Sequence, residues 1–199
     1  KLLWQGSFGL AQRNPDVAVT DDTRFNVGSI NKSFTQVAVA QLLAAKKLAL
    51  GDTLARWVPE FPNKEAASKI TVGQLLTHRS GLGDIFGPRF AQAVTRGLPT
   101  LSDVLKFYAD EPLVFAPGTG QRYSNLGYVA LGVIVERASG MPFGSYLEKN
   151  IFTPAGMKTA IAWATDPGAP GLARGYTAVD ESKPNVLEQA PFAGRVYHP

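Results

Sequence analysis

A serine and a lysine in the stretch FNVGSINKSF have the residue types and the spacing that acyl-transfer chemistry needs. Ser29 and Lys32 are three positions apart, so on a helix their side chains lie on the same face. A serine hydroxyl becomes a strong nucleophile when a neighbouring base takes its proton, and an amine shielded from water can be that base. Gly28 would let a substrate approach the backbone here. The stretch therefore predicts a nucleophile at a helix entrance, where free backbone N–H groups favour an oxyanion.

A second short motif, Tyr123-Ser124-Asn125, follows the turn-rich segment PGTGQR. A phenol can act as a general base and then as an acid when a nearby ammonium lowers its pKa. The amide of Asn125 offers both a donor and an acceptor, which suits it to holding a lysine and a substrate.

Each motif also has a purely structural interpretation. Ser29 would then be a helix N-cap with Lys32 extending to solvent, and Tyr123 would lie in a turn before a helix capped by Asn125. Two motifs in this order, each at a predicted helix entrance, favour the catalytic interpretation.

The composition restricts the other classes of function. The chain has 199 residues, 45% of them hydrophobic, as expected for a globular protein with a core. No apolar run reaches the roughly 18 residues of a membrane span, and the net charge of +4 is scattered rather than gathered in a nucleic-acid-binding stripe. The absence of cysteine excludes Cys-zinc sites, and two histidines, His78 and His198, are too few for a histidine-built metal site without carboxylate help.

The pattern of the chain predicts the elements that must position the two motifs. We expect a hairpin from residues 2–10 and 17–20, and a long, largely buried helix from 29 to 48. Thr71 and Gln74 have the spacing of a capping box, which predicts a short helix over 72–78 that contains His78, interpreted as structural. Further helices are expected over 102–111, 126–139 (ending at Gly140) and 142–150. The stretch WVPEFPNKEAASK and residues 153–199 are expected to be irregular.

SINK followed by YSN resembles the signatures of the serine β-lactamase and penicillin-binding protein superfamily. The Tyr-x-Asn form is similar to that of class C β-lactamases, D,D-peptidases and related esterases. Other stretches share the likeness, which extends over about residues 1–160: LALGDTLARWVPEFP, ITVGQLLTHRSGL, PGTGQRYSNLGYVALGVIVERASG and IFTPAGMKTA.

The resemblance implies an α+β fold of the β-lactamase/transpeptidase type. In that fold a helical domain packs on an antiparallel sheet with flanking helices, and the sheet would be incomplete in this chain. Residues 1–28 would form N-terminal strands of the α/β region and residues 29–152 the helical region with both motifs. Residues 153–199 would be an irregular segment leading back towards a C-terminal sheet.

The resemblance also implies a role for each motif residue. Ser29 would be the acylated nucleophile, its N–H half of the oxyanion hole, and Lys32 its proton partner. Tyr123 would be the general base and then the acid for the leaving group. Asn125 would orient Lys32 and the substrate, and Gly28 would border the substrate. No cofactor is implied.

The sequence departs from the family pattern in one motif. The family's third motif, a Lys-Thr-Gly, Lys-Ser-Gly or His-x-Gly triad, does not follow Tyr-x-Asn here, and His198 is followed only by Pro199. The family's first helix and later strands are not recognised either. We therefore expect the chain to be a fragment of a longer protein.

Several functions stay open at this point. The leading hypothesis is a serine hydrolase that acts on a β-lactam, a D-alanyl peptide or a small ester, since all three present a carbonyl to the serine. The alternatives are a non-catalytic ligand-binding or sensor domain on the same scaffold, or an inactive fragment that self-associates through an unpaired strand edge. Cytoplasmic esterases and periplasmic or secreted cell-wall enzymes both fit the resemblance.

Overall fold

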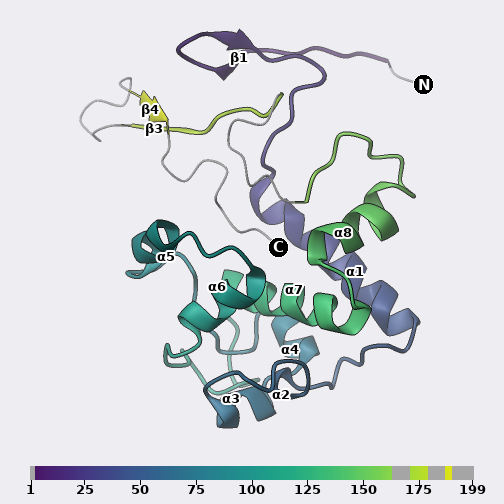
Figure 1. Cartoon of the computed structure of the whole chain (residues 1–199), viewed down its shortest axis with the longest axis vertical. Coiled ribbons are helices and arrows are strands. Elements are labelled where there is room, and N and C mark those ends of the chain that lie inside the picture. The colour runs from purple at the N-terminus through teal and green to yellow at the C-terminus, as the bar shows by residue number, and fades with distance from the viewer. Residues whose placement is uncertain (1–2, 163–170, 179–186, 190–199) are drawn as a thin grey trace. The chain divides into compact units, whose positions relative to one another are not determined.

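The computed structural model shows a mainly helical protein with two short strand pairs (Figure 1). It describes residues 3–162, 171–178 and 187–189. The chain divides into two compact units, one of residues 1–27 with 158–196 and one of residues 28–157 with 197–199. The domain division predicted from the sequence stays a prediction. Within the described ranges, no helix has both the length and the apolarity to cross a membrane.

The second unit contains every helix that the structure describes. The elements, in chain order, are η1 (Gly28–Asn31), α1 (Lys32–Ala44), α2 (Leu54–Trp57), α3 (Lys64–Lys69), α4 (Val72–Leu76), α5 (Phe90–Arg96), α6 (Leu101–Tyr108), α7 (Asn125–Ser139), α8 (Phe143–Leu147) and η2 (Glu148–Phe152).

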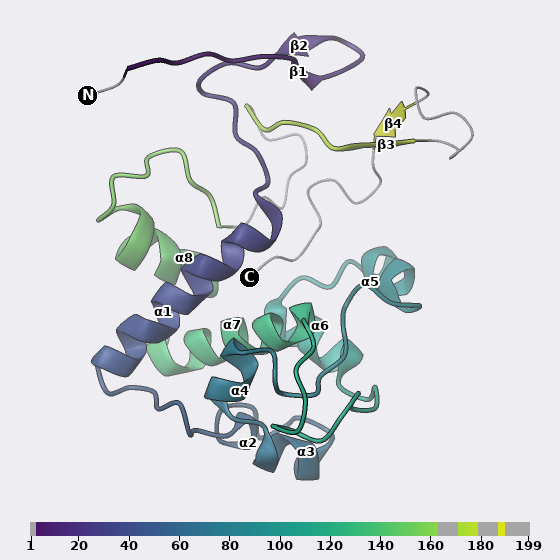
Figure 2. The ribbon, with the colours of Figure 1, turned by 180° about the vertical axis from the view of Figure 1, so that it is seen from behind.

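Helix α7 forms the centre of this unit. Its residues from Asn125 to Val135 are all buried, and it packs against α1, α4 and α6. Figures 1 and 2 show it from opposite sides, each time between α1 and α6. A helix that is apolar around most of its circumference must lie inside the protein. Since Asn125 is its first residue, the second sequence motif is held directly by the core.

Side-chain caps fix where two of the predicted helices begin. At α4, Gln74 N–H donates to Thr71 Oγ1 at 3.2 Å and Thr71 N–H donates to Gln74 Oε1 at 3.0 Å, which confirms the predicted capping box. At α7, Gly127 N–H donates to Ser124 Oγ at 2.9 Å. The predicted end of α7 is confirmed as well, because Gly140 has a φ of 72°, the left-handed conformation that favours glycine.

The first long helix differs from its prediction at both ends. Gly28–Asn31 form a 3-10 turn, and the α-helix runs from Lys32 to Ala44 rather than from 29 to 48. Ser29 is therefore not an N-cap; that position belongs to Asn31, whose side chain makes no capping hydrogen bond. The chain leaves the helix through Lys46, at a φ of 54°, which the apolar pattern does not reveal.

The prediction of a loop over WVPEFPNKEAASK is wrong. Its first residue, Trp57, ends α2, and its second half forms α3. Both helices are too short for an apolar period, and they begin at side-chain caps: Arg56 N–H donates to Thr53 Oγ1 at 3.3 Å, and Ala66 N–H donates to Asn63 Oδ1 at 2.9 Å. Helix α5 was likewise not predicted, whereas the helix expected over 142–150 is found as α8 continued by the π-helical turn η2.

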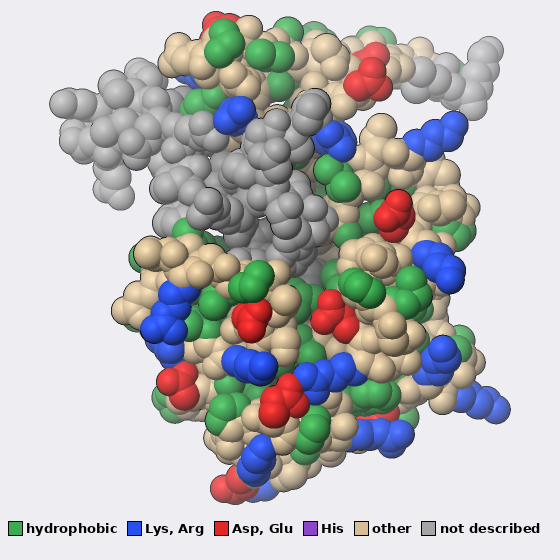
Figure 3. Space-filling view, in the orientation of Figure 1, with side chains coloured by type: hydrophobic (Ala, Val, Ile, Leu, Met, Phe, Trp, Pro, Cys, Tyr) green, Lys and Arg blue, Asp and Glu red, His purple; other side chains and the backbone are tan. Residues whose placement is uncertain are grey.

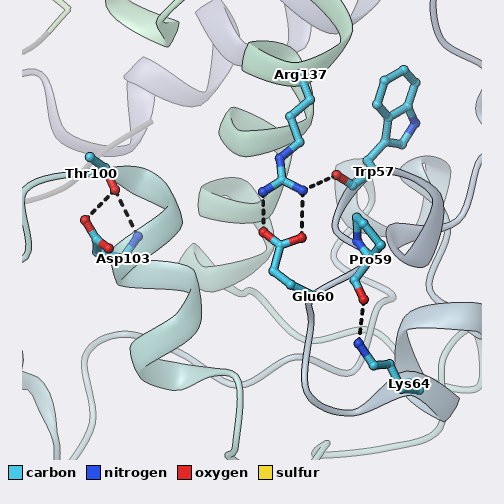
Figure 4. A network of polar contacts seen from close by, with 7 residues as sticks. All are labelled: Trp57, Pro59, Glu60, Lys64, Thr100, Asp103 and Arg137. Carbon is cyan, nitrogen blue, oxygen red and sulfur yellow. Dashed lines mark hydrogen bonds and ion pairs between the residues drawn. The ribbon is translucent and has the colours of Figure 1, made fainter.

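One arginine joins these short helices to the core helix (Figure 4). Arg137, near the end of α7, donates to both carboxylate oxygens of Glu60 and, at 2.5 Å, to the carbonyl oxygen of Trp57. The planar guanidinium suits such a two-bond contact with a carboxylate. Figure 4 also shows the Thr100–Asp103 contact that caps α6.

In the part of the first unit that the structure describes, there are two antiparallel strand pairs. Strands β1 (Leu10–Gln12) and β2 (Val17–Ala18) form the predicted hairpin, although its first strand begins at the last residue of the range expected for it. Strands β3 (Tyr176–Ala178) and β4 (Leu187–Gln189) pair within residues predicted to be irregular, so that prediction is wrong there. Backbone hydrogen bonds connect the pieces, since Ala173 N–H donates to Arg24 O and Arg174 N–H to Ala11 O, both at 2.8 Å. His198 lies outside the described residues.

Candidate active site

The two sequence motifs meet in space around the Lys32 amine. Lys32 Nζ donates to Asn125 Oδ1 at 2.6 Å and to Ser29 Oγ at 3.4 Å. Although it is a lysine, Lys32 is only 5% exposed. Its Nζ lies 5.0 Å from the centre of the Tyr123 ring and 5.4 Å from that of Tyr128, close enough for both ring faces to stabilise a cation. The amine is thus turned into the protein and not into solvent.

The Tyr123 hydroxyl is the second group in contact with the serine hydroxyl. It donates to Ser29 Oγ at 2.5 Å. Burial raises the pKa of Tyr123, but hydrogen bonding with Lys32 and Ser29 and the positive charge of Lys32 together outweigh burial, so its pKa falls below the ordinary value of 10. At 48% exposure, Tyr123 leaves the serine hydroxyl open to an incoming molecule. A reachable hydroxyl with a proton-accepting group on each side can act as a nucleophile.

Asn125 is fixed at both ends of its amide. The Asn125 Oδ1 atom accepts from Lys32. The Asn125 Nδ2 atom donates to the Asp84 carboxylate, at 2.9 Å from Asp84 Oδ1 and 3.2 Å from Asp84 Oδ2. Only 5% of Asn125 is exposed, so these partners replace water as its hydrogen-bonding groups. The residue joins the lysine to the loop that follows α4.

Gly28 has a backbone conformation that favours glycine, and its predicted place beside the substrate stays a prediction. Its φ of 55° lies in the left-handed region, which starts the 3-10 turn that carries Ser29. A Cβ built at this position would meet no described atom within 4 Å, so close packing does not require glycine. Backbone conformation does.

Ser29, Lys32, Tyr123 and Asn125, all selected from the sequence, are therefore brought into contact, and their roles remain predictions. Asp84 was not selected from the sequence, because no spacing rule could have connected it with Asn125, 41 residues away. Tyr128 was not selected either; its hydroxyl accepts from Gln36 Nε2 at 2.7 Å and donates to Leu76 O at 3.1 Å.

His78 contacts the motif rather than the nucleophile. Ser124 N–H donates to His78 Nδ1 at 3.2 Å, and the imidazole lies against Tyr123 and Tyr128, with ring centres 4.6 and 5.1 Å apart. Burial lowers the pKa of His78, and the charge of Lys32 lowers it further. Among the residues that the structure describes, no group of three His, Cys, Asp or Glu side chains could hold a metal ion.

Comparisons with known proteins agree with this geometry. The model of the family described as Beta-lactamase matches residues 1–196. Penicillin-binding protein 4* of Bacillus subtilis (strain 168) is 35% identical over 158 residues, covering 78% of this chain and 34% of that protein. Esterase EstB of Burkholderia gladioli is 35% identical over 170 residues, covering 79% of this chain and 43% of that protein.

A solved structure is similar over nearly the whole chain. The crystal structure of a penicillin-binding protein from Bacillus halodurans matches with a TM-score of 0.80 and 31% identity, covering 94% of this chain and 58% of that one. The chain spans less than half the length of the two curated relatives above.

Proposed function

The chain belongs to the beta-lactamase family. We propose that it carries the nucleophile of a serine hydrolase, which forms an acyl-enzyme at Ser29. Family membership and the likeness to the Bacillus halodurans structure also confirm the predicted α+β fold of the β-lactamase/transpeptidase type. One observation carries the proposal: the Ser29 hydroxyl contacts both the buried Lys32 amine, at 3.4 Å, and the Tyr123 hydroxyl, at 2.5 Å.

Acylation follows from these contacts. Ser29 Oγ attacks the substrate carbonyl carbon while its proton passes to the Tyr123 oxygen, whose deprotonated form the positive charge of Lys32 favours. The lowered pKa of Tyr123 makes its phenolate accessible nearer neutral pH. The Ser29 N–H, in the turn that leads into α1, can donate to the carbonyl oxygen as it becomes negative. Tyr123 then returns the proton to the leaving group, and water releases the acyl group.

The substrate would be a carboxylic acid derivative, that is, an ester or an amide whose carbonyl carbon Ser29 can attack. Relatives named as penicillin-binding proteins and as an esterase favour a β-lactam, a D-alanyl peptide or a small ester. Each presents one carbonyl to the serine, and the residues described above do not separate them. Asn125 would hold the substrate amide, where one is present, through the same side chain that contacts Lys32.

Covalent labelling tests this function directly. We expect a fluorophosphonate and a fluorescent penicillin to label the protein, with the adduct located on Ser29 by peptide mass spectrometry. Ser29→Ala should abolish labelling, and rates should fall by roughly 10⁴-fold or more, because nothing replaces the nucleophile. Ser33→Ala is the matched control, since Ser33 is exposed on the first turn of the same helix.

Two outcomes would redirect the interpretation. Labelling that survives in Ser29→Ala would refute the nucleophile. Binding of a small ester such as p-nitrophenyl acetate without release of p-nitrophenol would instead favour the non-catalytic ligand-binding alternative on the same scaffold.

A further inference from the structure

Asp84 is a charged group next to the site that the proposed function does not use. It lies in the loop between α4 and α5, half-buried, and its carboxylate faces Asn125 Nδ2 at 2.9 and 3.2 Å. Beyond Asn125 lies Lys32, so the three side chains form a continuous line from a carboxylate, through an amide, to an amine.

The chemistry of these three groups allows one orientation of the amide. A carboxylate only accepts hydrogen bonds and an ammonium only donates them. In an asparagine amide the oxygen accepts and the NH₂ group donates, although the two ends have nearly the same shape. With Asp84 on one side, the NH₂ end must face the carboxylate, and Oδ1 must then face Lys32. A reversed amide would place two donors, the NH₂ and the ammonium, against each other.

We propose that Asp84 is a positioning residue, an inference that rests on the proposed function. It fixes the orientation of the Asn125 amide and thereby holds Lys32 beside the nucleophile. Asp84 itself touches neither Ser29 nor Tyr123 in any hydrogen bond described by the structure. Its effect is transmitted through Asn125 Oδ1, which receives the shorter of the two Lys32 contacts.

The loop that carries Asp84 is held on both sides of it. Ser124 Oγ donates to Gly83 O at 2.6 Å, and Tyr108 OH donates to Ile85 O at 2.9 Å. Burial raises the pKa of Tyr108 to about 12, so this donor keeps its proton. Asp84 Oδ1 also accepts from Phe86 N–H at 3.1 Å. A group fixed this firmly can orient a partner, as a freely moving surface carboxylate cannot.

Asp84 also acts through its charge. The groups around Tyr123 are Lys32, which lowers the tyrosine pKa, Asp84, which raises it slightly, and the His78 ring stacked against it. Asp84→Asn would remove the raising influence and shift the acidic limb of the activity profile to lower pH, while the maximal rate falls because the amide is no longer locked.

The test compares Asp84→Asn with the swapped pair Asp84→Asn/Asn125→Asp in the whole protein. The probes are the rate of Ser29 labelling by a fluorophosphonate and the hydrolysis of p-nitrophenyl acetate. We expect Asp84→Asn to lower both rates by about 10- to 100-fold, the scale that misplacing a catalytic group costs. The loss should fall on kcat and not on KM. Asp110→Asn, which removes an exposed carboxylate that pairs with Arg89, should leave both rates unchanged.

The swapped pair separates positioning from a merely structural role. In it, the new amide at position 84 donates to the new carboxylate at position 125, which again offers an acceptor to Lys32. We expect it to regain part of the lost rate. A swapped pair no faster than Asp84→Asn, or a rate for Asp84→Asn equal to that of the wild type, would overturn the proposal.

The remaining outcomes are also decisive. If Asp84→Asn is unfolded at the assay temperature, the swapped pair alone decides: a folded, active pair supports positioning, and a folded, inactive pair refutes it. A wild-type protein that the fluorophosphonate does not label at Ser29 would refute the proposed function itself, whereas normal labelling of both the wild type and Asp84→Asn would refute only the role of Asp84.

Discussion

At the scale of single residues, the buried amine of Lys32 is the most informative group. Removing a charge from water costs several kcal/mol unless its new surroundings compensate. Here the compensation comes from Asn125 Oδ1, Ser29 Oγ and two tyrosine ring faces. Among the residues that the structure describes, no carboxylate pairs with the amine, and the Asn125 amide lies between it and Asp84.

His78 makes the stability of the protein depend on pH. Burial, followed by the charge of Lys32, lowers its pKa below the ordinary 6.5. As pH falls below 6.5, the unfolded chain takes up a proton that the folded protein resists, so this contribution to stability is full above 6.5 and is lost towards the lower folded pKa. Protonation of Nδ1 would also remove the acceptor for Ser124 N–H.

We therefore expect the free energy of unfolding to fall between pH values of about 7.5 and 5.5, and to fall less in His78→Asn. Asparagine offers an acceptor to Ser124 and tolerates the left-handed backbone at this position, where φ is 57°. Urea unfolding at each pH, for both proteins, measures the difference. An equal fall in both would show that His78 is not the responsible group.

At the scale of elements, the sequence predicts those features that depend on residues close together in the chain. The capping box at Thr71, the end of α7 at Gly140 and the apolar run of α7 all depend on residues close together in the chain, and these predictions are confirmed. The bounds of α1 were wrong because its start is set by the left-handed Gly28 and its end by Lys46, two backbone conformations without an apolar signature.

The same limit explains what was missed. Helices α2 and α3 have only 4 and 6 residues, too few for an apolar period. Strands β3 and β4 have 3 residues each. At the site, Ser29 and Lys32 are close in sequence and could be paired from spacing. The Asp84–Asn125 contact exists only because the loop after α4 returns to the start of α7, which a single sequence does not state.

The ion pair between Arg137 of α7 and Glu60 in the loop after α2 gives a prediction at this scale. The hydrogen bond from Arg137 lowers the pKa of Glu60 to about 2, so the pair stabilises the fold above pH 4.5 and loses this effect as pH falls towards 2. Both side chains are about a third exposed, so solvent screens the pair, and we expect Glu60→Gln to cost only about 0.5–1 kcal/mol at neutral pH.

Urea unfolding near pH 7 and again near pH 3 measures this cost, which should shrink at the lower pH. Glu65→Gln is the control, because Glu65 forms an exposed pair with Lys69 within a single helix and should have no measurable effect. If Glu60→Gln lowers the free energy of unfolding equally at both pH values, then packing and not charge accounts for the contribution of this ion pair.

At the scale of the whole molecule, apolar and charged surfaces are distributed differently. On the face drawn in Figure 3, Lys and Arg side chains alternate with Asp and Glu over the helices, without a stripe of one sign. The hairpin unit instead exposes large apolar side chains, with exposures of 90% at Leu3, 73% at Trp4 and 76% at Phe8, followed by Leu10 and Val17 at 46% each. Exposed large apolar side chains near a short strand pair favour association.

We therefore expect the 199-residue chain to self-associate with increasing concentration, as measured by light scattering and sedimentation velocity. The double variant Trp4→Ser/Phe8→Ser should shift the equilibrium towards monomer, because it removes the two large aromatic side chains that stack on each other there. Leu50→Ser is the matched control: Leu50 is 52% exposed but belongs to the helical unit, away in sequence from any strand edge. If the control lowers association as much as the double variant does, then the attraction is a general property of exposed apolar surface, and the hairpin edge has no special part in it.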